Sequence, residues 1–477
     1  MSTPSLSLRL LGVLGLGAAG LAHAAAPNDG YLDTSWGLFG SGKSLVPFDL
    51  GGDLLDQAAG SALGSDGSLF LAGTVKDANG IKRMGVAKLK PDGTLDTSGF
   101  GGGDGRVLSA TNAGTLVATA LVRRNTTLYV AGYREVNATN RDFALCVFST
   151  AGVPLSFLGT GTSCVTASFD LGPTISQDMA YDLAVQPDGK IVLAGTTAVN
   201  SSSDTYAAFV RFNANGLLDG SFGLSHSGQT LLRTSNVFQR HRVRAVAVAS
   251  NGKIVAVGST DVVGASDTGA LVIRLNSDGS PDPLSNTDEL TFAVDGSSSR
   301  DTVLNDVLLE DVADAADDRM VVVGYAQTAG NPTGANRLIA RLAPAGSFDA
   351  SFSGGDGSDG YDISGGAAGT YGVFESVAAA PGGGAYFPAG TFSFPGEPSD
   401  LNVCRYRADG GTETFFEGLS ACKNVDFSLP GAFETGAEVQ VMGDGIYLSG
   451  TGFKTASDGD FVAAKFTLDR IFRDRFE

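Results

Sequence analysis

The chain has 477 residues, with 51 acidic residues against 32 Lys and Arg, which gives a formal net charge of -19 at pH 7. A surface this acidic repels nucleic acid and anionic lipid, so both are excluded as expected partners. A hydrophobic content of 43% over this length is enough to bury a large core.

The N-terminus has the pattern of a secretory signal. Arg9 is its single charged side chain, an apolar stretch runs from Leu10 to Leu21, and Ala22-His23-Ala24 offers the small residues that a signal peptidase needs. This stretch is too short to span a bilayer, and no later run reaches the length of a membrane helix. We expect residues 1–24 to be removed and 25–477 to be secreted, periplasmic or held at the cell surface, without a membrane span. A buried N-terminal helix is the alternative.

An internal repeat runs through the rest of the chain. A short apolar run ends in a glycine seven times, at nearly even intervals. Regular spacing of this kind is the mark of a repeat architecture. The glycines are Gly73, Gly132, Gly195, Gly258, Gly324, Gly390 and Gly450. The expected repeats cover 51–108, 109–170, 171–234, 235–296, 297–363, 364–428, and 429–477 together with 28–50.

The third repeat predicts four strands. Asp188-Gly189 and Asn215-Gly216 lie between apolar runs, which is a hairpin signal. Two of the runs are apolar at consecutive positions, so both faces of each small sheet must be covered. Sheets stacked face to face around an axis achieve this and leave only short edges. We therefore predict an all-β fold, a seven-bladed β-propeller of four-stranded blades. The strands expected in this repeat are 180–186, 190–196, 206–213 and 228–234.

The repeat resembles the delta-60 repeat family. That family has an Asp-Gly-Lys turn, an apolar strand ending in Ala-Gly, an Arg-containing strand, and an Asp-Gly-x-Leu-Asp-x-x-Phe-Gly segment. The resemblance covers nearly all of 28–477, although the second, sixth and seventh copies are degenerate. It implies a secreted bacterial β-propeller and no defined activity. The matching segments here are Asp188-Gly189-Lys190, Ala194-Gly195, Arg211-Phe212 and Asn215 to Gly223.

The chain begins with the end of a repeat. Residues 28–37, including Asp33 and Trp36, match the tail of the pattern, and a strand candidate follows at Lys43 to Leu50. We expect this segment to complete the last blade and close the ring. The alternative is that it packs with the strands that follow it. The segment 470–477 resembles short C-terminal tails of exported bacterial proteins and is equally a worn repeat end.

The four cysteines are the most specific local signal. Cys146 and Cys164 follow Gly132 at the same two offsets at which Cys404 and Cys422 follow Gly390. Only the pairs 146–164 and 404–422 respect this equivalence, and an exported protein meets an oxidising compartment. We predict these two disulfides.

A charge pattern also follows the repeat. A base in the third strand is followed eight positions later by an acid, and in the second repeat both are lost together, to Val147 and Leu155. Paired loss is expected of a buried ion pair, because a lone buried charge is costly. The predicted structural pairs are Lys88 with Asp96, Arg211 with Asp219, Arg274 with Asp282, Arg341 with Asp349, Arg405 with Glu413, and Lys465 with Asp33 across the closure.

No catalytic motif stands out. There is no Gly-x-Ser-x-Gly elbow, and His226 and His241 have no catalytic context and are expected in surface loops. No cofactor is expected. Closely spaced Asp356, Asp359 and Asp362 are a candidate Ca²⁺ loop, with turns entering a strand as the alternative.

The sequence favours a monomeric binding or scaffold module at the cell envelope or outside the cell, with an unidentified protein or glycan as partner. The alternatives are a carbohydrate-active hydrolase or lyase, which needs only two carboxylates, or a Tyr and a base, placed by the fold, and a purely structural surface protein. Aromatic residues flanking the turn between the second and third strands are the candidate binding residues. They are Tyr133, Tyr206, Tyr325, Phe392 and Phe394.

Overall fold

The computed structural model describes residues 30–51, 54–110, 114–171, 175–199, 201–232, 239–262, 268–282, 293–294, 297–298, 301–310, 318–328, 331–352, 360–365, 368–416, 420–427, 433–455 and 457–468. The expected signal peptide, the C-terminal segment 470–477, Asp356 and Asp359 lie outside these ranges. The described residues form strands, turns and one short 3-10 helix, η1 (Leu38–Gly40). No helix among them is long and apolar enough to cross a membrane.

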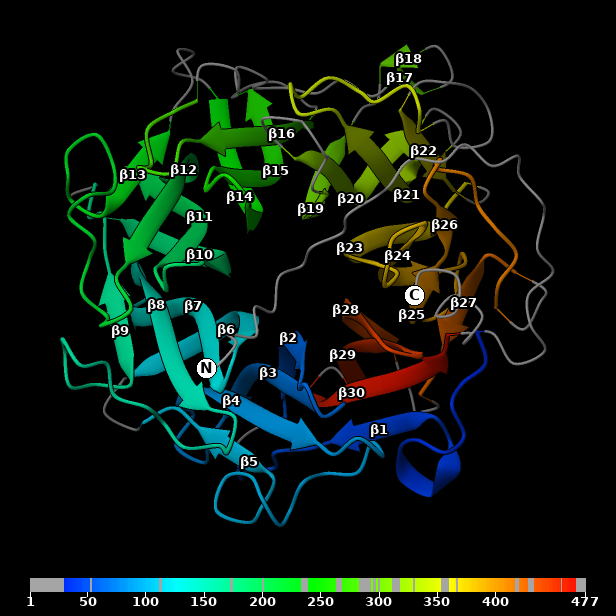
Figure 1. Cartoon of the computed structure of the whole chain (residues 1–477), viewed down its shortest axis with the longest axis horizontal. Coiled ribbons are helices and arrows are strands. Elements are labelled where there is room, and N and C mark those ends of the chain that lie inside the picture. The colour runs from blue at the N-terminus through cyan, green and yellow to red at the C-terminus, as the bar shows by residue number, and fades with distance from the viewer. Residues whose placement is uncertain are drawn as a thin grey trace, which may run out of the picture.

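The strands form small antiparallel sheets arranged radially in a ring, a β-propeller (Figure 1). Within most blades each strand pairs with the next along the chain, and the first strand lies nearest the ring axis (Figure 1). The first blades are β2 (Gln57–Leu63), β3 (Leu69–Lys76), β4 (Lys82–Leu89) and β5 (Arg106–Leu108); β6 (Thr115–Arg124), β7 (Thr127–Asn137), β8 (Asn140–Ser149) and β9 (Cys164–Ala167); and β10 (Ser176–Val185), β11 (Ile191–Val199), β12 (Ser201–Phe212) and β13 (Gln229–Leu232).

The remaining blades follow the same order around the ring (Figure 1). They are β14 (Gln239–Val248), β15 (Ile254–Val262) and β16 (Thr268–Leu275); β19 (Thr302–Glu310), β20 (Arg319–Thr328), β21 (Asn331–Leu342) and β22 (Tyr361–Ser364); β23 (Tyr371–Ala379), β24 (Ala385–Ser393), β25 (Asp400–Cys404), β26 (Tyr406–Arg407) and β27 (Cys422–Val425); and β28 (Phe433–Met442), β29 (Gly445–Thr455) and β30 (Asp458–Thr467) with β1 (Lys43–Val46). A short pair, β17 (Ala293–Val294) and β18 (Ser297–Ser298), lies between β16 and β19 in the chain.

The exceptions to pairing with the next strand along the chain are β27, which pairs with β25, β26, which pairs with β24, and β1, which pairs with β30. Short parallel contacts, β8 with β10 and β21 with β23, join neighbouring blades.

The apolar core lies between neighbouring blades. The second strand β3 is buried at all but its last position, because blades cover both of its faces. Apolar side chains from adjacent blades accordingly form shared clusters, such as the one that joins Phe209 and Val192 to Val243 and Leu271. Continuous apolar runs in the sequence therefore reflect burial on two sides.

The repeated glycine is required by a close backbone approach. Gly195 on β11 lies opposite Ala180 on β10, and a Cβ built on Gly195 would lie 2.0 Å from the carbonyl oxygen of Met179. The first strand is bulged immediately after Ala180. A side chain at Gly195 would push this inner strand away, so glycine marks the position opposite the bulge in each repeat.

The N-terminal segment completes the last sheet. β1 pairs antiparallel with β30, with Lys43 opposite Ala464 and Val46 opposite Phe461. Trp36 is buried and meets the ring of Tyr447 edge-on, with ring centroids 6.2 Å apart. The alternative, in which this segment packs with the strands that follow it, is wrong, because β2 begins a separate sheet.

Both predicted disulfides are confirmed, between Cys146 and Cys164 and between Cys404 and Cys422. Each joins the third strand of its blade to the outer strand.

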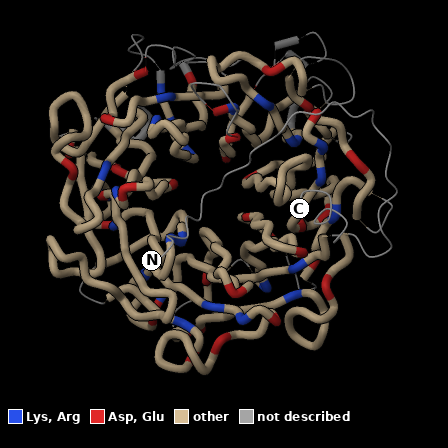
Figure 2. Tube along the Cα trace, in the orientation of Figure 1, with Lys and Arg blue, Asp and Glu red and all other residues tan. Residues whose placement is uncertain are grey.

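All six expected charge pairs make contact, and basic and acidic positions recur around the ring (Figure 2). The guanidinium of Arg211 also donates to the carbonyl of Ser277 in the next blade, so the base links two blades. Burial alone would raise the pKa of Asp219, but hydrogen bonds from Ser221 and Lys190 and the charge of Arg211 lower it below its ordinary value. The nitrogen–oxygen distances are 3.1 Å for Lys88–Asp96, 2.7 Å for Arg211–Asp219, 2.8 Å for Arg274–Asp282, 2.8 Å for Arg341–Asp349, 3.3 Å for Arg405–Glu413 and 2.8 Å for Lys465–Asp33.

Candidate functional site

The first strand of every blade carries a β-bulge or a related irregularity in its middle. A bulge leaves a residue unpaired and re-aims its side chain, and bulges are frequent beside functional sites. In six blades a single residue is left over, and its chemistry differs from blade to blade. These residues are Ala59, Thr119, Tyr181, Arg244, Asn305 and Glu375.

Two of the bulged residues tie neighbouring blades together. The hydroxyl of Thr119 donates to the carbonyl of Ala180 at 3.0 Å, and the amide of Asn305 donates to the carbonyl of Phe374 at 2.8 Å. Tyr181 and Arg244 make no such bond to the next blade among the described residues. Their side chains are therefore available for another role.

A group of residues around Arg244 forms what we call the axial site: Tyr181, Arg244, Tyr325, Tyr371 and Glu375. Burial raises the pKa of each of the three tyrosines, and in each the charge of Arg244 opposes that rise. Arg244 is itself exposed, and Tyr371 is 47% exposed. Four neighbouring blades thus bring three phenols and one carboxyl within electrostatic reach of Arg244.

Glu375 is the titratable acid of the axial site. Burial raises its pKa to about 7, against hydrogen bonds from Ala437 and Thr391 and the charge of Arg244. Its carboxylate accepts the amide N–H of Ala437 at 2.5 Å and the hydroxyl of Thr391 at 3.3 Å. Near neutral pH the carboxyl is partly protonated, so it does not fully neutralise Arg244.

The predicted aromatic residues are only partly brought together. Tyr325 belongs to the axial site. Burial raises the pKa of Tyr133, the charge of Arg141 opposes that rise, and Glu135 and Tyr181 add to it, so Tyr181 is the one axial residue within electrostatic reach of Tyr133. Phe392 and Phe394 form a separate pair, with ring centroids 5.1 Å apart.

Tyr206 lies on β12 opposite Thr197, two strands outward from Tyr181. Sequence reasoning missed Tyr181, Tyr371, Arg244 and Glu375. The sequence does hold a signal for the bulged residues. In six repeats the bulged residue directly follows the residue that pairs with the repeated glycine.

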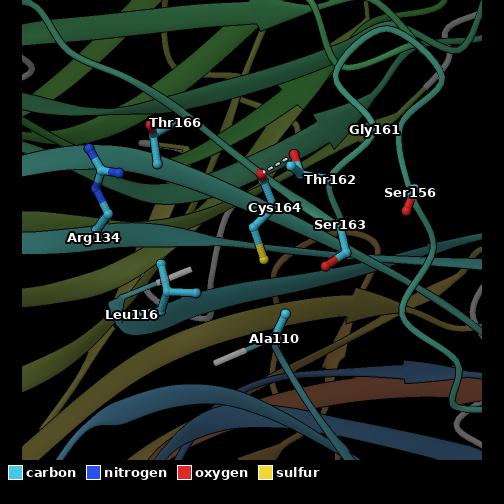
Figure 3. Close-up of a pocket in the computed structure, with 9 residues that line it drawn as sticks. All are labelled: Ala110, Leu116, Arg134, Ser156, Gly161, Thr162, Ser163, Cys164 and Thr166. Atoms are coloured by element: carbon cyan, nitrogen blue, oxygen red, sulfur yellow. Dashed lines mark hydrogen bonds between the residues drawn. The ribbon is translucent and has the colours of Figure 1, made fainter. Parts of the chain in front are cut away.

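A cavity of about 340 Å³ lies beside the first disulfide (Figure 3). Hydroxyl groups of Ser156, Thr162 and Thr166 line it, and Arg134 is its one charged lining residue. Arg134 pairs with Asp142, and the sulfur of Cys164 is held in the disulfide. The described lining residues therefore offer hydroxyl groups but no carboxylate or histidine that could act as a general base.

Two clusters of three carboxylates could hold a hard cation such as Ca²⁺, which prefers oxygen ligands. Asp142 and Asp178 correspond in position to Asp400 and Glu434, whereas the middle acid differs. Within each cluster the carboxylate oxygens lie within 4.8 Å of one another. Burial and the nearby charges of Asp400 and Asp426 raise the pKa of Glu434 to about 7. The clusters are Asp142, Asp170 and Asp178, and Asp400, Asp426 and Glu434.

The inner acids of these clusters also have structural partners. Asp178 accepts the backbone N–H of Phe169 at 2.7 Å, and Asp56 accepts that of Phe48 at 2.7 Å at the corresponding place. In the same region as Asp56, the side-chain nitrogen of Lys454 lies 2.7 Å from the carboxylate of Asp460. A lysine of the protein thus supplies the positive charge there. These acids therefore fasten the end of an outer strand to the next blade.

The expected Ca²⁺ loop can be followed only at Asp362. This residue lies on β22 and accepts a hydrogen bond from the hydroxyl of Tyr406 at 2.8 Å.

The expectation of a loop position was wrong for His241, which is buried on β14 with Nδ1 3.0 Å from the hydroxyl of Thr260. It stands where other repeats have an inner-strand acid such as Asp178.

Several solved structures match the chain at low sequence identity and with TM-scores below 0.5. The polysaccharide lyase Uly1 is 9% identical with a TM-score of 0.41, over 86% of this chain and 90% of that one. A PL25 ulvan lyase is 8% identical with a TM-score of 0.42, over 92% and 95%. The sialidase of Trypanosoma rangeli is 11% identical with a TM-score of 0.37, and the match covers 89% of this chain but 58% of the sialidase. Similarity at this level bears on neither ligand nor reaction.

No curated protein matches the sequence. A family model does match four of the repeats, at residues 64–98, 186–222, 249–284 and 315–352. These segments span the turn, the second and third strands and the Asp-containing segment that pairs with the third-strand base. The model is that of a β-propeller domain of unknown function, DUF5122.

Proposed function

We propose that this protein is an exported β-propeller that binds a carbohydrate at the axial site. The observation that carries the proposal is the convergence of Tyr181, Tyr325 and Tyr371 on Arg244 from separate blades. Tyrosine combines a flat apolar ring with a polar tip, which suits the alternating apolar faces and hydroxyls of a sugar.

The architecture that supports this site is a seven-bladed ring of the delta-60 type, closed by β1 against β30. Two disulfides suit an oxidising compartment, so we place the mature protein outside the cytoplasm, in the periplasm, at the cell surface or secreted. We propose that it acts as a monomer.

The binding proposal is tested by screening the mature protein against a panel of glycans and then comparing two variants. Tyr371→Ala should weaken binding by roughly tenfold through lost apolar contact. Tyr31→Ala is the matched control, because Tyr31 is similarly exposed but lies outside the axial site. Equal binding by wild type and Tyr371→Ala would contradict the axial location.

A second function, a carbohydrate-active hydrolase or lyase, is favoured by one observation, the pKa of Glu375 near 7 beside Arg244 and Tyr371. A general acid or base works best when its pKa lies near the working pH. Ligands found in the screen should then be cleaved slowly, giving new reducing ends or an unsaturated product that absorbs ultraviolet light. Glu375→Gln should abolish that cleavage while retaining binding, and the absence of cleavage by wild type would leave a binding module.

A further inference from the structure

Arg244 stands apart from the other arginines near the ring axis. Its strand neighbours Arg240 and Arg242 both pair with Asp261, at 3.3 and 3.0 Å. Arg141 donates to Gln177 at 2.6 Å and lies over the ring of Tyr133. Within the described part of the chain, the side chain of Arg244 makes neither a hydrogen bond nor an ion pair, and the residue is exposed.

An exposed arginine without a partner is unusual in this molecule. Acidic residues outnumber basic ones by 51 to 32, so partners for a base are abundant. Among the described arginines only Arg244 and Arg407 are exposed, and Arg407 pairs with Asp409. Arg244 lies instead among phenols and the hydrogen-bonded carboxyl of Glu375, which leaves its guanidinium donors open.

The surroundings of Arg244 fit a negatively charged group attached to a ring-shaped ligand. A guanidinium presents its N–H groups as a planar fork that matches the two oxygens of a carboxylate. Tyr181 and Arg244 take the same bulged position on the neighbouring first strands β10 and β14, and Glu375 takes it on β23. Tyr325 on β20 and Tyr371 on β23 lie close enough to Arg244 for its charge to oppose the rise of their pKa values. A sugar ring that packs on these tyrosines would bring its own carboxylate to the arginine.

We propose that the ligand of the axial site is an acidic polysaccharide whose uronate carboxylate binds Arg244. This inference rests on the carbohydrate-binding function proposed above and specifies its substrate class. The carboxylate supplies the charge that Arg244 lacks within the protein. The acidic remainder of the surface repels the polymer elsewhere, so binding is confined to this site.

The experiment compares an oligogalacturonate with the same oligomer after its carboxyl groups have been reduced to alcohols. Calorimetric titration of the mature protein should show binding about tenfold tighter for the acidic oligomer, the size expected of one charge-assisted contact. Arg244→Gln should lose that preference and bind both oligomers alike. Arg407→Gln removes the same charge from an exposed surface pair with Asp409 and should leave both affinities unchanged.

Each other outcome has a definite meaning. Equal affinity of wild type for the acidic and reduced oligomers, with binding still lost in Tyr371→Ala, would overturn the acidic ligand and leave the axial carbohydrate site standing. Preference for a sulfated, carboxylate-free glycan that depends on Arg244 would overturn the uronate and assign a sulfate ester instead. An Arg244→Gln protein that keeps the acidic preference would overturn the role of Arg244. Absence of binding to every glycan in the panel would overturn the proposed function as well.

Discussion

Replacement of Arg211 and Asp219, singly and together, tests whether the charge pairs hold the blades in place. Both side chains are buried, and Arg211 also reaches the carbonyl of Ser277 in the next blade. The second repeat has Val147 and Leu155 at these positions and keeps the same backbone hydrogen bond between them, at 3.0 Å against 2.9 Å. The chain itself therefore supplies the apolar replacement.

The size of the effect follows from what each change leaves behind. Arg211→Val leaves the Asp219 carboxylate buried with Lys190, 3.1 Å away, as its remaining cation. Breaking a buried pair costs about 3–5 kcal/mol of stability. Because Lys190 remains as a cation beside Asp219, we expect Arg211→Val to lose about 3 kcal/mol. Asp219→Leu leaves a buried guanidinium that still lies over the ring of Phe222, at 4.5 Å.

The double variant removes both charges and leaves neither unpaired. We expect it to lose less stability than the sum of the single variants, with a coupling energy of about 1–3 kcal/mol. Urea unfolding is followed by circular dichroism and by the fluorescence of Trp36, the single tryptophan. It gives the free energy of unfolding of each of the three variants, provided that both signals report the same transition. Strict additivity, or a wild-type stability for Arg211→Val, would refute the reasoning that these pairs are buried and interdependent.

Three further predictions concern the second disulfide, the N-terminal strand β1 and the buried acid Glu438. Replacing Cys404 and Cys422 by alanine should lower the free energy of unfolding by about 3 kcal/mol through the loop of 18 residues, and a change below the error of urea unfolding would contradict this. Deleting residues 25–50 should expose the edge of β30 and cause aggregation, which light scattering would reveal; a stable monomer would mean that β1 is dispensable. Burial raises the pKa of Glu438 from 4.5 to about 8, so the folded protein keeps a proton that the unfolded chain releases, and stability should fall as pH rises through this window. Glu438→Gln should weaken that fall, measured as melting temperature at both ends of the window, and identical pH profiles would exclude the effect.

The ring, its disulfides and its charge pairs could be predicted from the sequence because they recur. The four cysteines and the charge pairs share fixed offsets from the repeated glycine, so equivalence between repeats specified each partner. Lys465 was assigned in this manner to Asp33, near the opposite end of the chain, and the two lie 2.8 Å apart. Recurrence reports a packing requirement that every blade must meet.

The axial site could not be predicted in the same way. Tyr181, Arg244 and Glu375 belong to different repeats, and they meet only when the ring closes. Their shared feature is the bulge, whose place is marked by the glycine on the neighbouring strand. His241 failed for a related reason, because a polar residue inside an inner strand has no local signal that distinguishes it from one in a loop.

Recurrence and variation along the repeat separate the residues that maintain the fold from those that can carry function. The third-strand base and its acid recur because they tie each blade to the next, and a change in one requires a change in the other. The bulged residue of the inner strand differs in each of six blades, which is allowed because the backbone bulge does not depend on the side chain it displays. Arg244 is exposed and makes no bond that holds blades together among the described residues, in contrast to Arg211. Substitutions at Arg244 should therefore reduce ligand binding with little loss of stability, whereas substitutions at Arg211 should do the reverse.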